Sequence, residues 1–214
     1  MNKSFRRFTL VEMLTVIAII SILAGLVIPI VIISRQRGRE TQAKSDIAAI
    51  VSAIKKLDAD YSKMLYKDGT NYKIGGKDVD VSSDIATIDG EVYDAMIAEL
   101  SAPKAKDVSV SVNKRKRSYL EPKKGFDPTK TYSDQKDTLW RDPWGKPYKV
   151  YVKVTRDGEL ELPGCKDDKT IAADVAVYSF GANGTDDKGC NVELDECISS
   201  GTHKNHDDIA SWNL

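Results

Sequence analysis

The sequence predicts an α+β fold in which one long N-terminal helix packs against a small antiparallel β-sheet. Two observations lead to this class. An uncharged run of 21 residues, from Met13 to Ile33, continues directly into an amphipathic helical pattern. After residue 139, short runs of alternating apolar and polar residues are separated by turn signals. A helix with an apolar stripe cannot bury that stripe alone, so the later strands are expected to cover it.

The apolar segment 8–33 is predicted to be a transmembrane helix that also takes part in assembly. As a helix, its uncharged residues rise about 1.5 Å each, enough to cross the roughly 30 Å core of a bilayer. Glu12 lies at the edge of this segment, where an unpaired carboxylate costs on the order of a few kcal/mol. Pro29 lies inside it and removes one backbone hydrogen bond. An export signal peptide is the alternative, but the run is longer than the usual core of about 7 to 15 residues.

Residues 34–66 are predicted to continue the helix as an amphipathic segment, and residues 1–7 precede it as a basic leader. The apolar positions recur at steps of three and four and so form one stripe. They are Ala43, Ile47, Ile50, Val51, Ile54, Leu57, Tyr61, Met64 and Leu65. One helix from about Thr9 to Leu65 is therefore expected, embedded in lipid in its first half and forming the spine of a globular head in its second.

Residues 67–138 are predicted to be a variable αβ region, to which we assign no chemistry. Gly69, Gly75 and Gly76 indicate turns. A helix is expected over 90–100, capped by Asp89, and a short strand over 108–112. The basic run Lys114-Arg115-Lys116-Arg117 is more typical of a solvated loop than of a binding patch.

Residues 139–214 are predicted to hold the β-sheet and a C-terminal metal loop. Asp142 precedes a Pro-Trp-Gly turn and is expected to fix it. The alternating run 148–154, the Asp-Gly turn near residue 157 and a second strand reaching residue 162 predict a hairpin. A third strand is expected over 175–180.

Composition argues against two large classes of function. The chain has 32 basic and 32 acidic residues and no platform of interleaved aromatic and basic residues, so binding to nucleic acid is not expected. It has no nucleophile elbow and no glycine-rich phosphate loop after a strand, and it has only two histidines. We therefore expect a protein that is not an enzyme.

The N-terminal pattern resembles that of type IV pilins and of the pseudopilins of type II secretion. The shared features are a basic leader, a Phe followed by Thr-Leu-Val-Glu, and a Pro 21 residues after the Phe. Here these are Lys3, Arg6, Arg7, Phe8, Thr9, Leu10, Val11, Glu12 and Pro29. The later stretches RDPWGKPY, YSFGANG and DDIASWNL are similar to those of the major pseudopilin of type II secretion.

This resemblance implies a type IV pilin-like fold and a structural subunit that polymerises into a periplasmic pseudopilus driving protein secretion. Its implied partners are further copies of itself, minor pseudopilins, the inner-membrane secretion platform and the prepilin peptidase. The peptidase would cut between Arg7 and Phe8, although the family usually has Gly or Ala where this chain has Arg7. Glu12 and Pro29 would act in assembly. The chain would cross the inner membrane once, with its head in the periplasm. The alternatives are a type IV pilus subunit and a membrane-tethered surface binding module.

The acidic segment near the C-terminus predicts a Ca²⁺ site. Seven carboxylates stand against two lysines between residues 183 and 208, and Ca²⁺ prefers clustered oxygen ligands on a flexible backbone. The resemblance implies the Phe180 carbonyl, the side chain at Asn183 and the carboxylate of Asp208 as ligands. Asn183 stands where the family has Asp, so either the affinity falls or Asp207, Asp186 or Asp187 supplies the missing charge. A solvated acidic loop without metal is the alternative.

Cys190 and Cys197 are predicted to form a disulfide, because an oxidising compartment favours pairing of two cysteines in one loop. A zinc site built from Cys190, Cys197, His203 and His206 is the competing interpretation, although the spacing between the cysteines exceeds the usual two to four residues. Cys165 has no assigned partner.

Overall fold

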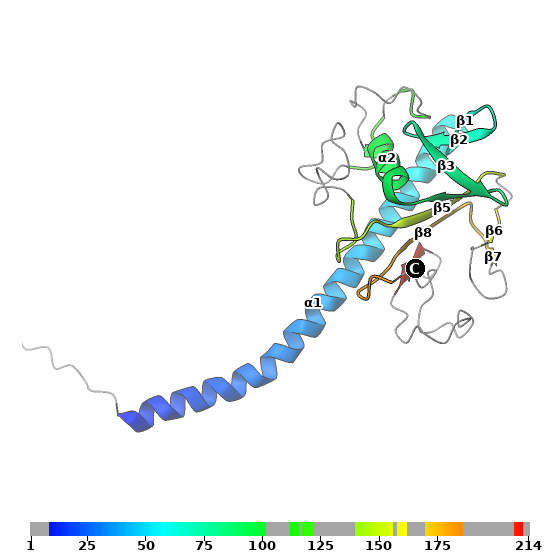
Figure 1. The fold of residues 1–214 in the computed structure, drawn as a ribbon. Coiled ribbons are helices and arrows are strands. Elements are labelled where there is room, and N and C mark those ends of the chain that lie inside the picture. The colour runs from blue at the N-terminus through cyan, green and yellow to red at the C-terminus, as the bar shows by residue number, and fades with distance from the viewer. Residues whose placement is uncertain are drawn as a thin grey trace, which may run out of the picture. The chain divides into compact units, whose positions relative to one another are not determined.

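The computed structural model describes residues 9–101, 112–115, 117–121, 140–155, 158–161, 170–185 and 208–211. The chain divides into two compact units, 1–39 and 40–214, whose described parts we call the stem and the head. The elements are α1 (Leu10–Tyr61), β1 (Tyr66–Asp68), β2 (Asn71–Ile74), β3 (Lys77–Ser82), β4 (Ile85–Ile88), α2 (Gly90–Ser101), β5 (Lys149–Lys153), β6 (Leu160–Glu161), β7 (Thr170–Ile171), β8 (Val175–Ser179) and β9 (Ile209–Ala210) (Figure 1). The long apolar helix and the small antiparallel sheet confirm the predicted α+β class.

Helix α1 ends four residues before the predicted end at Leu65. Ser62 follows it with a φ of 55°, and its N–H donates to the carbonyl of Asp58 at 2.7 Å. This left-handed cap closes the helix by satisfying one of its last carbonyls. Met64 and Leu65 are buried all the same, but they enter the core from the chain that follows the helix.

The head contains a seven-stranded antiparallel sheet in the order β1-β2-β3-β4-β5-β8-β9. Residues alternate strictly between its two faces. Val150 and Val152 of β5 pack into the main core with the buried stripe of α1 and with α2, whereas Tyr151 between them faces the other way. On that second face, Leu160 of β6 and Ile171 of β7 cover the sheet. The period of two thus gives the head a core on each side of one sheet.

Strands β1 to β4 form a meander in the region for which the sequence predicted only turns. Each connection has two residues, as the registers Asp68↔Asn71, Ile74↔Lys77 and Ser82↔Ile85 show. Both residues of the second and third connections have positive φ, as tight type I′ turns require. The predicted glycine turns are therefore present, but they join strands of the main sheet.

The predicted hairpin between the strand at 148–154 and the strand reaching residue 162 was wrong. Strand β5 pairs with β4 on one side and with β8 on the other, while β6 pairs with β7. The two neighbours of β5 offer longer and better buried partners than the two residues of β6. Local turn chemistry was outweighed by this non-local pairing. The helix predicted over 90–100 is present as α2, one residue longer.

Two buried polar contacts join elements that are distant in sequence. The hydroxyl of Tyr148 donates to Asp46 of α1 at 3.0 Å, and Gln42 donates to the other carboxylate oxygen at 2.8 Å. Arg141 forms a buried ion pair with Asp94 of α2 at 2.9 Å. Burial raises the pKa of Asp94 to about 6, although the Arg141 guanidinium opposes this shift.

The raised pKa of Asp94 predicts a specific dependence of stability on pH. Between about pH 4 and pH 6 the folded chain binds more protons at this carboxyl than the unfolded chain, so the free energy of unfolding falls as the pH rises. A shift of about two units corresponds to about 3 kcal/mol. Asp94→Asn should flatten this part of the profile, measured by urea unfolding of the detergent-solubilised chain. Burial also raises the pKa of Asp142, so in this variant Asp142 should still make the free energy of unfolding fall as the pH rises. An unchanged profile in the variant would contradict the assignment.

Candidate functional site

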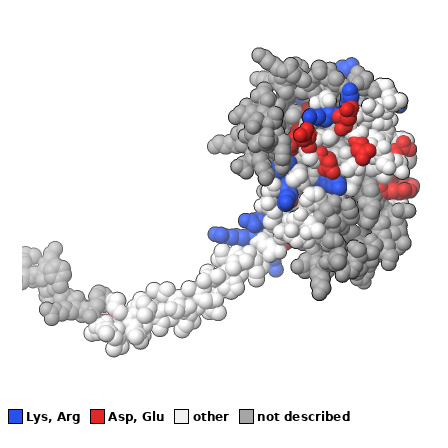
Figure 2. Space-filling view, viewed as in Figure 1, with Lys and Arg blue, Asp and Glu red and all other residues white. Residues whose placement is uncertain are grey.

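The stem exposes the apolar half of α1. Every large apolar side chain from Leu10 to Ile33 is exposed, between 41% and 80%. The most apolar window of 18 residues has a mean hydropathy of 3.2, and this helix is long and apolar enough to cross a membrane. Figure 2 shows this stretch as an almost uniformly uncharged surface. A surface of this kind is stable only against lipid or against other apolar helices.

A reciprocal hydrogen-bond box caps the start of α1. The backbone N–H and the hydroxyl of Thr9 each donate to Glu12 Oε2 at 2.9 Å. In return, the backbone N–H of Glu12 donates to Thr9 Oγ1 at 3.2 Å. This is the capping box expected for Thr followed three residues later by Glu. Glu12, predicted to act in assembly, therefore also has a local role within its own chain.

The polar groups inside the apolar half of α1 are largely satisfied within the helix. Thr15 donates its hydroxyl to the carbonyl of Val11, and Ser21 donates to that of Ile17. Pro29 lies within the continuous helix and has no N–H to give to Gly25, four residues before it. A side chain at Gly25 would meet no atom within 4 Å. The carbonyl at Gly25 is thus the weak point of the helical ladder, and the adjacent surface is open.

Two of the predicted Ca²⁺ ligands lie at the same end of the sheet. Ser179, the last residue of β8, pairs with Ile209, the first residue of β9, and Phe180 and Asp208 are the residues that adjoin this pair. Asp208 is fully buried. Asn183 is exposed in the turn that follows β8, and its side-chain oxygen accepts the N–H of Thr185 at 2.6 Å. No group of three metal-binding side chains occurs among the residues that the structure describes.

Asp142 fixes the turn beside this sheet end, as predicted. Its Oδ1 accepts the backbone N–H groups of Trp144 at 3.1 Å and Lys146 at 2.7 Å. Its Oδ2 accepts the hydroxyl of Ser179 at 2.7 Å, and Ser179 Oγ in turn accepts the N–H of Gly181. These bonds connect the Pro-Trp-Gly turn to the end of β8. The backbone around Phe180 is therefore held in place before any metal binds.

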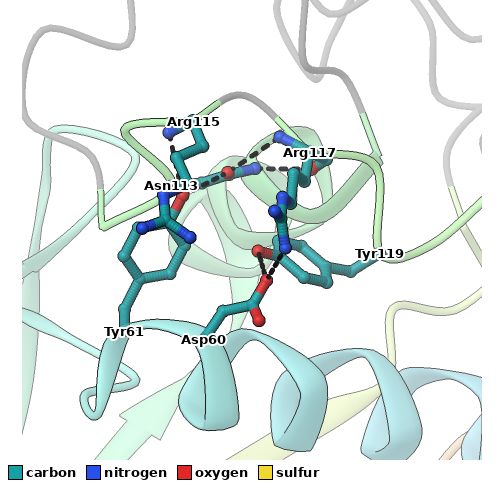
Figure 3. Close-up of polar contacts among 6 residues, drawn as sticks. All are labelled: Asp60, Tyr61, Asn113, Arg115, Arg117 and Tyr119. Carbon is teal, nitrogen blue, oxygen red and sulfur yellow. Dashed lines mark hydrogen bonds and ion pairs between the residues drawn. The ribbon is translucent and has the colours of Figure 1, made fainter.

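The basic run is held at the C-terminal end of α1, and we call its described residues, 113–115 and 117, the basic loop. Asp60 pairs with Arg117 at 2.8 Å and accepts the hydroxyl of Tyr119 at 2.7 Å (Figure 3). The Tyr119 hydrogen bond is the main cause of the lowered pKa of Asp60. The backbone N–H of Arg115 donates to the hydroxyl of Tyr61 at 2.8 Å. Both ends of the loop are thus attached to the last turn of the helix.

Buried Glu99 of α2 anchors the start of the basic loop. Its Oε1 accepts the N–H groups of Val112 at 2.6 Å and Asn113 at 3.0 Å, and its Oε2 accepts the N–H of Gly75 at 2.9 Å. The Asn113 side chain then bridges the loop: its Oδ1 accepts the backbone N–H of Arg117, and its Nδ2 donates to the carbonyl of Arg117. Sequence reasoning missed this anchor. A glutamate at an apolar-face position of a helix, next to Leu100, was the available signal.

Several predicted residues lie outside the described part of the chain. They are Arg7, Phe8, Asp207, Cys165, Cys190, Cys197, His203 and His206. The cleavage site, the disulfide, the zinc alternative and the fourth calcium ligand therefore stay predictions. Of the strand predicted over 108–112, only Val112 is described, and it is buried in the core.

Comparison with known proteins gives no match: no family model, no curated protein and no solved structure matches this chain.

We predict that Glu99→Ala destabilises the head by about 3 kcal/mol or more, because it leaves three backbone N–H groups without their carboxylate. The matched control is Glu91→Ala on the same helix, where the side chain is exposed and pairs only with Lys77. That variant should unfold at almost the wild-type urea midpoint. Equal midpoints for the two variants would show that the Glu99 contacts contribute little.

Proposed function

We propose that this chain is a structural filament subunit, a pseudopilin that polymerises in the periplasm and drives type II secretion. The observation that carries the proposal is the exposed apolar half of α1, with a single carboxylate at its start. Lipid can cover such a helix before assembly, and the helices of neighbouring copies can cover it afterwards. The N-terminal sequence motif supports the same function, and the proposed partners are further copies, minor pseudopilins, the secretion platform and the prepilin peptidase.

The capping box sharpens the role proposed for Glu12. Among the described residues, its carboxylate accepts hydrogen bonds from Thr9, which is neutral and does not balance the negative charge. Removal of the first seven residues would create an ammonium group at Phe8. If that ammonium group pairs with Glu12 of a neighbouring copy, their attraction would offset the free-energy cost of removing both charges from water among the packed apolar stems.

Two substitutions separate the charge of Glu12 from its capping role. Glu12→Gln keeps a side chain that can complete the box with Thr9 but removes the charge. Thr9→Val removes the box and keeps the charge. We expect Glu12→Gln to abolish filaments and Thr9→Val to retain them, scored by electron microscopy of sheared cells.

The control for these variants is the urea midpoint of the head, which should equal that of the wild type in both. The intact mass of the wild-type chain recovered from filaments should show the loss of seven residues. Normal filaments from Glu12→Gln would exclude charge pairing as the basis of assembly. An uncleaved chain in filaments would exclude the Phe8 ammonium as the partner.

We also propose that Ca²⁺ binds at the end of β8. Phe180 and Asp208 adjoin the last pair of β8 and β9, and a backbone carbonyl and a carboxylate are both oxygen donors of the kind that Ca²⁺ prefers. Asn183 supplies an amide oxygen from the following turn, and Asp207 is the proposed source of further charge. The metal would neutralise a buried carboxylate and tie the C-terminal strand to β8.

Calcium should therefore stabilise the detergent-solubilised chain. A ligand that binds only the folded state at a hundredfold excess over its Kd adds about 2.7 kcal/mol. Asp208→Asn should remove this response, and Asn183→Asp should strengthen it by adding a charge. Glu161→Gln, an exposed carboxylate on β6, is the control and should respond as the wild type does. Thermal unfolding in EGTA, Ca²⁺, Mg²⁺ and Zn²⁺ measures these effects, and rescue by Zn²⁺ alone would favour the cysteine and histidine site instead.

A further inference from the structure

The basic loop displays positive charge at its surface, although Arg115 as well as Arg117 acts on the carboxylate of Asp60. Arg117 is paired with Asp60, but the side chains of Lys114 and Arg115 are exposed and have no ion-pair partner among the described residues. The loop backbone is nevertheless held by Glu99, Asn113 and Tyr61. Like charges that are fixed side by side repel one another, and mobility of the backbone cannot relieve this repulsion. A rigid basic loop of this kind is suited to an acidic partner.

The head carries an acidic surface that complements this loop. Asp78 and Asp80 lie two residues apart on β3 and so share one face of the sheet, and both are exposed. Asp80 pairs with Thr87, and Asp89 follows two residues later in the chain. Figure 2 shows carboxylates on the head, interspersed with Lys and Arg side chains. We call Asp78, Asp80 and Asp89 the acidic face. Asp80 and Asp89 have no ion-pair partner in the described part of the chain, and Asp78 has only Lys73 at 3.9 Å.

We propose that the basic loop of one copy docks on the acidic face of a second copy, an inference that rests on the proposed filament. The zero net charge of the chain supports a partner of the same kind, because each copy carries both complementary surfaces. The two surfaces are different, so the contact is heterologous. Each copy that uses its basic loop still presents a free acidic face. Repetition of such a contact produces an open chain of subunits when the rotation between neighbours does not close a ring.

Exposed charge pairs add little affinity individually but select the partner orientation and speed its encounter. The basic loop would therefore set the register between heads, while the apolar stems supply most of the affinity. Because exposed charges are screened within about 10 Å at 0.1 M salt, the contribution of the contact should weaken as salt increases.

A charge-swap experiment on the full chain tests the contact. Arg115→Glu and Asp80→Lys should each raise the concentration needed for polymer formation by roughly threefold to tenfold. The double variant Arg115→Glu with Asp80→Lys should restore the wild-type value, because the pair is then reversed. Lys67→Glu is the matched control: it reverses one exposed charge on β1, outside both surfaces, and should have no effect. Sedimentation of polymer from detergent-diluted protein measures all four variants.

Zero-length carbodiimide cross-linking provides a second measurement that does not require filaments. The reagent joins an amine to a carboxylate in direct contact. In a mixture of ¹⁴N- and ¹⁵N-labelled chains in detergent, cross-links of mixed isotope should connect Lys114 to Asp78, Asp80 or Asp89. Their yield should fall with Arg115→Glu and with increasing salt.

The outcomes separate this inference from the proposed function. Filaments that form normally in both single variants, without mixed-isotope cross-links, would overturn the head contact and leave the filament proposal intact. Cross-links between acidic face and basic loop in a wild-type chain that never polymerises would support the contact and overturn the filament. If the double variant fails to recover and inorganic polyphosphate binds the wild type but not Arg115→Glu, the loop binds a foreign polyanion and the inference is wrong.

Discussion

The head is organised by the need to cover the apolar stripe on the second half of α1. Ala43, Ile47 and Ile50 are completely buried, and they share one core with residues of β2 to β5, α2 and β8. Strands β5 and β8 contribute to that core, strands β1 to β4 and β9 extend their sheet, and β6 and β7 form a separate two-stranded sheet. Apolar packing alone allows the sheet to slide along the helix, whereas the hydrogen bond from Tyr148 to Asp46 can form at only one position and so fixes where the sheet lies on α1. The stripe therefore determines both where the sheet lies and how it is placed.

The basic loop depends on the same core through a second carboxylate. Glu99 joins the β2–β3 turn to residues 112 and 113, so the loop cannot move without breaking bonds to the sheet. The close approach requires Gly75. Its φ is 52°, and a Cβ there would lie 2.9 Å from the Cβ and the carbonyl oxygen of Ala95. A glycine that the sequence marks only as a turn thus allows a helix, a turn and a loop to share one carboxylate.

The sequence was sufficient to predict what depends on periodicity within one segment. The stripe of α1, helix α2 and the alternation of β5 were all visible in this way, and the turn role of Asp142 was visible from the Pro-Trp-Gly sequence that follows it. Pairing between segments was not visible. The Asp-Gly signal near residue 157 indicated a hairpin, but β5 finds better partners in β4 and β8. The meander from β1 to β4 was missed because its strands are short and only partly apolar, so their turn residues dominated the pattern. Glu99 was missed: its position on the apolar face of a helix indicates burial, but it does not identify the backbone groups of two distant segments that it binds.

The order of synthesis places a further demand on this protein. Val150 follows Leu57 by 93 residues, so the stripe of α1 leaves the ribosome long before the strand that covers it exists. At about 5 to 20 residues per second, the gap lasts on the order of 5 to 20 seconds. Contacts between such distant segments also form slowly, since a long loop has to close first. During this interval the nascent chain exposes two apolar surfaces, one suited to lipid and one that needs its own sheet. Cover for both surfaces before either finds a wrong partner is thus a condition for obtaining the folded head.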